Sequence, residues 1–112
     1  MRYAYKDLGQ QSAGTTVVVR WSGSAANVML LDPVNFSKYQ YTDGRPFFYD
    51  VGGRYPRGPV RLPIPEDGRW YVVVDRGSYA GGAPTVEVIT PEDRQPKAKG
   101  RHEELATGER AV

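Results

Sequence analysis

Residues 60–75 read VRLPIPEDGRWYVVVD and are the clearest structural signal in the chain. Side chains alternate between the two faces of a β-strand, so apolar residues at every second position predict a strand with one buried face. Both halves of the stretch alternate in this way, with Val60, Leu62 and Ile64 in the first half and Trp70, Val72 and Val74 in the second. The intervening Glu66-Asp67-Gly68 is typical of a turn. We therefore predict two antiparallel strands joined as a hairpin.

Further strands are predicted on both sides of this hairpin. Residues 15–21 are rich in β-branched residues, and the Ser-Gly-Ser sequence at 22–24 has turn chemistry. The apolar run at 27–31 is expected to return as an antiparallel hairpin partner, and residues 47–51 and 85–89 are also predicted as strands. About six or seven short strands predict an all-β fold, either a small antiparallel β-sandwich or a partly closed barrel.

One short helical segment and one long loop are predicted between these strands. Asp32 followed by Pro33 has the pattern of a helix N-cap with proline at the first helical position. Residues 33–39 are therefore expected to form one or two helical turns, with Val34, Phe36 and Tyr39 on one side. The Gly-Gly pair that begins residues 52–59 predicts a loop, and loops on a β scaffold often carry function.

The C-terminal part of the chain has a different composition from the rest. From Pro91 onward it has no aromatic residue and almost no large apolar one. Such a segment buries too little surface to offset the entropy of ordering it. We predict a single β domain over residues 1–90 and a polar, flexible C-terminal tail over residues 91–112.

Composition excludes several classes of protein. There is no Cys among the 112 residues, so disulfide scaffolds, thiolate zinc sites and cysteine nucleophiles are excluded. No apolar leader follows Met1, and no stretch approaches the roughly 18 apolar residues of a membrane span. The net charge is +2 without a concentrated basic block, which argues against nucleic-acid binding. A cytoplasmic protein without a membrane partner is expected.

Several segments, taken together, resemble the bacterial domain-of-unknown-function family DUF1883. They are Tyr5-Lys6-Asp7-Leu8-Gly9, GSAANVMLLD (residues 23–32), Asn35-Phe36, Tyr39, Gly52-Gly53, Pro59-Val60 and GRWYVVVD (residues 68–75). The likeness spans about residues 3–89, and its ordered set of motifs is specific although each motif alone is weak. It implies a small β domain.

The resemblance also implies a kind of role. The family looks like a stand-alone bacterial module in some proteins and an N-terminal companion of a TIR domain in others, which implies an adaptor or sensing role linked to TIR-type defence signalling. In this chain any such effector would be a separate protein. The chain departs from the family pattern at residues 76–84, which interrupt the last strand and put a ligand contact by that loop in doubt.

No constellation of catalytic or metal-binding residues is apparent. The single histidine, His102, lies in the polar tail, without the orienting partners that acid–base or nucleophilic catalysis needs. Asp32, Asp43, Asp50 and Asp75 lie near strand ends, where they could converge as paired carboxylates or Ca²⁺ ligands, but turn and capping roles are more usual for such residues. We expect no enzymatic activity, no metal and no cofactor.

The candidate binding surface is a cluster of aromatic and arginine side chains. The candidate residues are Tyr39, Tyr41, Arg45, Phe48, Arg54, Tyr55 and Arg57. Aromatic rings beside guanidinium groups recognise proteins and small polar ligands. On a strand half of such rings must point inward, so a core role for these aromatic residues stays open. The sequence predicts a non-enzymatic binding or adaptor module for a protein or small polar ligand; the alternative is a subunit of a larger assembly, such as a coat or decoration protein, with further copies as its partners.

Overall fold

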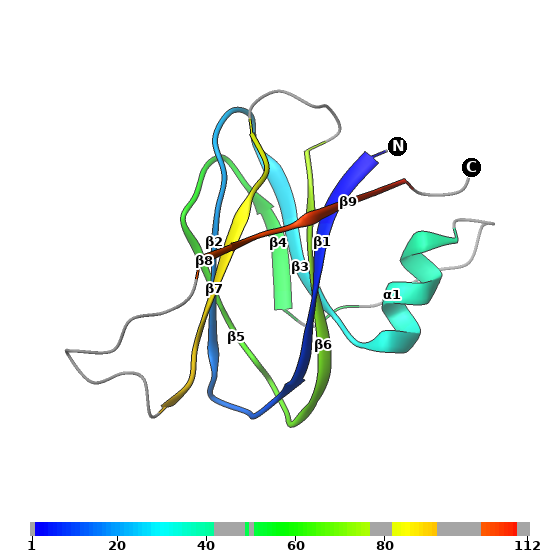
Figure 1. The fold of residues 1–112 in the computed structure, drawn as a ribbon, viewed down its shortest axis with the longest axis vertical. Helices are drawn as coiled ribbons and strands as arrows, with labels where there is room; N and C mark the ends of the chain where they lie inside the picture. The colour runs from blue at the N-terminus through cyan, green and yellow to red at the C-terminus, as the bar shows by residue number, and fades with distance from the viewer. Residues whose placement is uncertain (1, 42–48, 50, 77–81, 92–101, 110–112) are drawn as a thin grey trace.

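The fold is a β-sandwich with one helix on its outside. The computed structural model describes residues 2–41, 49, 51–76, 82–91 and 102–109. Within them, the larger antiparallel sheet has the strand order β4 (Val51–Tyr55), β3 (Ala26–Leu31), β6 (Gly68–Asp75), β1 (Arg2–Gln11) and β9 (Ala106–Glu109). The smaller sheet has the order β5 (Val60–Pro63), β2 (Thr16–Arg20), β7 (Thr85–Ile89) and β8 (His102–Glu104). The predicted all-β sandwich is confirmed (Figure 1).

The main core lies between the two sheets and is mostly aliphatic. Its buried side chains come from alternating positions, as period-two burial requires: Ala4, Val17, Val19, Ala26, Val28, Leu30, Val60, Leu62, Ile64, Trp70, Val72, Val74, Val86 and Leu105. The faces predicted for the strands of residues 60–75 are therefore confirmed. Burial of these side chains is the main source of stability.

A second, aromatic core lies on the outer face of the larger sheet, beneath helix α1 (Pro33–Gln40). The Phe36 ring stacks on Tyr71, with 4.1 Å between ring centroids and 9° between ring planes. The predicted helix start is confirmed, because the Asp32 side chain accepts the backbone N–H of Asn35 at 2.8 Å. The prediction for Val34 is wrong, because its side chain is 64% exposed while Phe36 and Tyr39 turn toward the sheet.

Both predicted hairpins are wrong in their pairing. β5 pairs with β2, whereas β6 pairs with β1 and β3 in the other sheet. Likewise β2 and β3 belong to different sheets. In each case the connection crosses the sandwich, so the apolar faces of successive strands meet across the core. Alternation shows which face of a strand is buried. It does not show whether the next strand pairs with it in the same sheet or packs against it from the other sheet.

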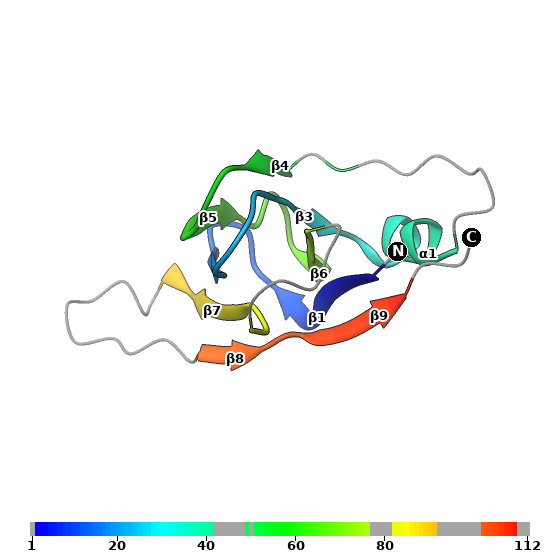
Figure 2. The same ribbon diagram turned by 90° about the horizontal axis from the view of Figure 1, so that it is seen from above.

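The prediction of a flexible tail is wrong for residues 102–109, which we call the C-terminal strap. Its first part, β8, pairs with β7, and its second part, β9, pairs with β1. Figure 2 shows the strap as one run along the side of the sandwich, passing from one sheet to the other. Strand pairing orders the strap through its backbone, and among its described side chains Leu105 is the buried one, so its order does not require an apolar sequence.

The predicted loop at residues 52–59 is wrong in its first part, because residues 52–55 belong to β4. Gly52 makes this possible. It has φ of 138°, and a Cβ atom there would lie 2.4 Å from the carbonyl oxygen of Val28. The glycine pair that indicated a loop therefore allows β4 to approach β3 closely. Most of the strand predicted at residues 47–51 lies outside the described residues.

Candidate functional site

The structure separates the predicted site residues into buried and exposed groups. Tyr39 is only 1% exposed, and its hydroxyl donates to the carboxylate of Asp75 at the end of β6. Tyr55 is half-buried and packs against the inner core. Both rings pack in the cores of the domain, which is the alternative role that the sequence left open for these aromatic residues. Arg45 and Phe48 lie outside the described residues.

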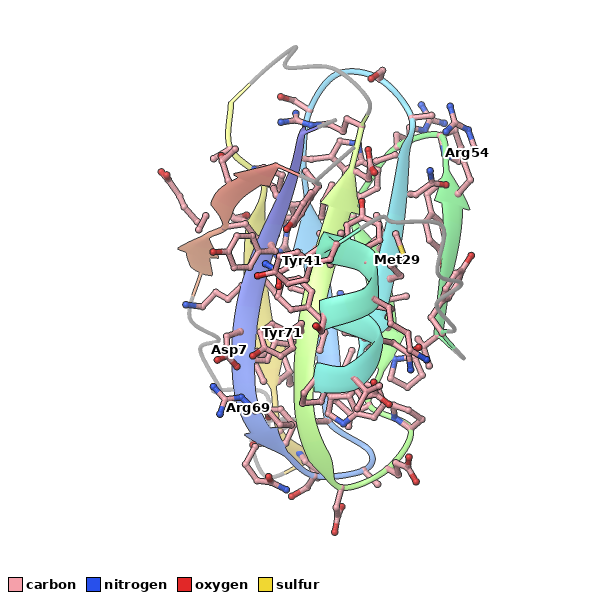
Figure 3. All side chains as sticks on the ribbon, turned by 90° about the vertical axis from the view of Figure 1, so that its right-hand side faces the viewer. Asp7, Met29, Tyr41, Arg54, Arg69 and Tyr71 are labelled. Carbon is pink, nitrogen blue, oxygen red and sulfur yellow. The ribbon has the colours of Figure 1, made fainter. Side chains whose placement is uncertain are left out.

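The other predicted residues are exposed but do not form one cluster. Tyr41 follows α1 and is 60% exposed. Figure 3 places it beside the helix over the middle of the sheet, whereas Arg54 lies at the sheet edge on β4. Arg57 is exposed in the short connection from β4 to β5. The arginine part of the predicted surface therefore lies at one side of the sandwich, away from Tyr41.

Three exposed arginines lie on the segment by which the chain crosses from the larger sheet to the smaller one. Arg54 lies on β4, Arg57 in the connection and Arg61 on β5, where it alternates with buried Val60 and Leu62. We call these three residues and the connection 56–59 the arginine arch. β4 and β5 are edge strands of their sheets, and they lie near each other. Tyr55 packs on the inner core, so its neighbour Arg54 faces the outer side of the larger sheet. Arg61 alternates with the inner residues Val60 and Leu62, so it faces the outer side of the smaller sheet.

The connection itself is held against the sandwich. The ring of Trp21 covers Gly58 so closely that a Cβ atom there would lie 3.0 Å from Cε3 of the ring. The indole N–H of Trp21 donates to the carbonyl of Ser24 at 2.9 Å, which fixes the ring. Pro56 and Pro59 restrict the backbone further. The guanidinium groups are thus carried by a backbone with few alternative conformations.

The arch arginines differ from the other arginines in their bonding. Among the residues that the structure describes, Arg54, Arg57 and Arg61 make no hydrogen bond or ion pair. By contrast, the remaining arginines with described side chains are all bonded: Arg20 to Glu87, Arg69 to Asp7, and Arg76 to the carbonyls of Ser22 and Gly82. The bonded arginines stabilise the fold, whereas the arch arginines have their donors available.

The Asp7–Arg69 pair shows what a structural arginine does here. Arg69 on β6 donates to Asp7 on β1 through Nε at 3.2 Å and also through Nη2, and it lies 5.9 Å from the centroid of the Tyr71 ring. Together with the backbone N–H of Gly9, this guanidinium lowers the pKa of the Asp7 carboxyl below its ordinary value of 3.8. The pair joins neighbouring strands at an irregularity in their register (Figure 3).

The chemistry of the arch is that of anion recognition. A guanidinium group has five N–H donors in a fixed plane and binds carboxylates with paired hydrogen bonds. Within the described residues β4 pairs only with β3, so the other edge of β4 carries unpaired backbone groups. An extended segment with acidic side chains matches both features, because it can pair with the strand edge and meet the arginines.

The aspartates that could have formed a carboxylate pair or a Ca²⁺ site are not brought together among the described residues. Asp32 caps the start of α1, and Asp75 bonds Tyr39 near the other end of the helix. Asp43 and Asp50 lie outside the described residues, as does the side chain of His102. No group of three or more His, Cys, Asp or Glu side chains suited to a metal ion occurs among the described residues.

Arg61 is the site residue that sequence reasoning missed. Its signal was present, because it alternates with the buried residues of the 60–64 strand and so must face outward. Its neighbourhood was hidden, because the pairing partners of β4 and β5 could not be read from the sequence. In the structure β5 follows β4 across the edge of the sandwich, so Arg61 belongs to the same crossing as Arg54 and Arg57, on the outer face of the smaller sheet.

Comparisons with known proteins identify the family. No described helix has the length and apolar character needed to cross a membrane. Neither the curated proteins nor the solved structures contain a match to the chain. The family model described as "Domain of unknown function (DUF1883)" matches residues 1–92, which include β1 to β7 and α1. The chain therefore belongs to the DUF1883 family.

Proposed function

We propose that this DUF1883 protein is a non-enzymatic binding module that recruits an acidic, extended segment of a partner protein through the arginine arch. The observation that carries the proposal is the contrast in bonding between the arch arginines and the other described arginines. Exposed arginines that do not stabilise the fold are available to a partner, and Arg is enriched at protein interfaces.

The position of the arch supports a protein segment as the ligand. The free edge of β4 supplies backbone donors and acceptors, and an added strand would satisfy them. Side chains of such a strand alternate, so every second residue would turn toward one face of the sheet. A partner with acidic residues at alternate positions would place its carboxylates beside Arg54 and Arg57. An effector protein recruited in this way would fit the adaptor role implied by the family resemblance.

Direct binding measurements test this proposal. The probe is a fluorescein-labelled peptide of alternating Glu and Thr, and the readout is fluorescence anisotropy at low and high salt. We expect the double substitution Arg54→Glu and Arg57→Glu to weaken binding about tenfold or more, because charged hydrogen bonds become repulsions. Arg54→Lys should cause a smaller loss, since lysine keeps the charge but not the paired geometry.

A matched control separates the arch from general electrostatics. Gln10→Glu lowers the net charge by one at an exposed position on β1, as Arg54→Gln does at the arch, and should leave the affinity unchanged. Equal affinities of the wild-type and the doubly substituted protein would refute the arch as the binding surface. Equal weakening by Gln10→Glu and by Arg54→Gln would show only long-range attraction of the acidic probe.

The alternative function, a subunit of a larger assembly, has one supporting feature. The C-terminal strap is held by strand pairing and, among its described side chains, by the buried Leu105, and such an extended segment is an element that neighbouring subunits can exchange. This alternative predicts a large homomeric species in sedimentation at high concentration. A monomer at all concentrations would exclude it.

A further inference from the structure

The C-terminal strap occupies a seam that runs across both sheets. On one sheet Glu104 lies opposite Thr85, and on the other Ala106 lies opposite Tyr5. The crossover residue between β8 and β9 is Leu105, whose backbone N–H donates to the carbonyl of Pro84 at 3.0 Å. The seam is therefore bounded by the edges of β7 and β1 and is filled along its length by one extended segment (Figure 2).

At two positions of the strap the surrounding structure restricts which side chain can fit. The Leu105 side chain is 4% exposed and joins the inner core. Gly108 lies against the Tyr3 ring, where a Cβ atom would come within 2.8 Å of Cζ of that ring. The seam thus selects an apolar side chain at the crossover and a glycine three residues later. The exposed Glu104, Ala106 and Thr107 meet no comparable restriction.

The strap is also distinct from the rest of the domain. The family match ends at residue 92, so the strap lies outside the part of the chain that defines the family. Among the described side chains of the strap, Leu105 alone belongs to the buried core, and the other core members come from residues 4–86. Most of the sandwich interior is consequently built without the strap.

From these observations we infer that the β1–β7 seam is a peptide-binding site, and that its ligand is the strap sequence itself, bound in cis and able to bind in trans. The recognition features are backbone pairing to β1 and β7, Leu105 in the core and Gly108 beneath Tyr3. The site is separate from the arginine arch, and its test is independent of the proposed function.

The experiment uses the full chain with a weakened strap. Leu105→Asp places a charge in the apolar seam, which should release the strap from its own domain. The probe is a labelled peptide of residues 101–112, added to the wild-type chain and to the Leu105→Asp chain. The control peptides carry Leu105→Asp or Gly108→Val. Circular dichroism reports folding before and after the peptide is added.

We expect the wild-type peptide to bind the Leu105→Asp chain at least about tenfold more tightly than it binds the wild-type chain, where the cis strap competes. Both control peptides should bind the Leu105→Asp chain at least about tenfold more weakly than the wild-type peptide. If the Leu105→Asp chain is unfolded alone, restoration of the fold by the wild-type peptide supports the site. A folded variant that takes up no peptide, or an unfolded one that the peptide does not restore, overturns it.

Discussion

The two sides of the sandwich are crossed by the chain in contrasting ways. On one side the strap passes between the sheets at Leu105, which is buried. On the other side the arginine arch passes between them with three exposed arginines. Exposed strand edges invite association with other chains, and proteins limit this by covering or charging them. One side is thus covered by a segment with an apolar anchor, whereas the other, where we propose that a partner binds, carries exposed arginine side chains.

The difference between the sides has a consequence for mutation. Residues at the strap crossing act through packing, so their substitution should change the free energy of unfolding. The arch arginines are exposed and make no bond among the described residues, so their substitution should leave stability within about 0.5 kcal/mol and, under the proposed function, change the binding of a partner. The predictions below test this division, beginning with the largest expected effect.

The largest effect is expected at the strap crossing. Leu105→Ala removes most of a buried side chain and should lower the free energy of unfolding by about 2–4 kcal/mol, measured by urea denaturation. The exposed neighbour provides the control, since Ala106→Ser should change stability by less than about 0.5 kcal/mol. A loss at Leu105 no greater than that at Ala106 would mean that the strap contributes no packing energy.

A smaller effect is expected within the edge strand β4. In Gly52→Ala the new Cβ atom would meet backbone atoms of Val28 and Met29, which cannot move aside as a side-chain tip can. We expect a loss of about 1–3 kcal/mol in the free energy of unfolding, together with weaker binding at the arch. Gly82→Ala is the matched control, because a Cβ atom there meets nothing within 4 Å. Equal stability of the two variants would disprove the close approach of β4 to β3.

The smallest effect concerns a paired arginine. The pKa of Asp7 is lowered by Arg69, so the folded state is favoured by this carboxylate above its unfolded pKa, and the contribution disappears as the pH falls through the lowered folded pKa. Asp7→Asn should therefore reduce the denaturation midpoint slightly at neutral pH, and the difference from wild type should shrink as the pH falls below about 4 and vanish only below the lowered folded pKa of Asp7. Arg54→Ala, at a residue without an ion pair among the described residues, should show no such pH dependence. A pH-independent deficit in Asp7→Asn would argue against the ion pair.

Much of the fold could be predicted from local patterns, but its pairing could not. Alternation at Val60, Leu62 and Ile64 identified their buried face correctly, because the period of side chains in a strand is local. Strand pairing is a non-local property, and the same alternation is compatible with a hairpin or with a crossing between sheets. The strands of the strap could not be predicted for a related reason. They form by pairing with the edges of β1 and β7, and the composition of residues 102–109 does not indicate such pairing.

The candidate site was also predicted only in part. Arg54 and Arg57 were expected at the surface and are exposed there. Tyr39 was expected in the same surface, but α1 lies across the outer face of the sheet and directs that ring onto Asp75. A tyrosine in a sequence pattern has an apolar ring and a polar end, so it suits a buried hydrogen bond as well as an interface. The position of Tyr39 is decided by its contact with Asp75, which is distant in the sequence.

The central claim, that the arch side receives a partner, is tested most directly by a residue-resolved NMR titration of the ¹⁵N-labelled wild-type chain with the alternating Glu and Thr peptide. We expect the amide shifts to be concentrated in β4, the arch and β5, and to disappear in the Arg54→Glu and Arg57→Glu variant. Shifts concentrated instead at β8 and β9, or spread evenly over the surface, would contradict it.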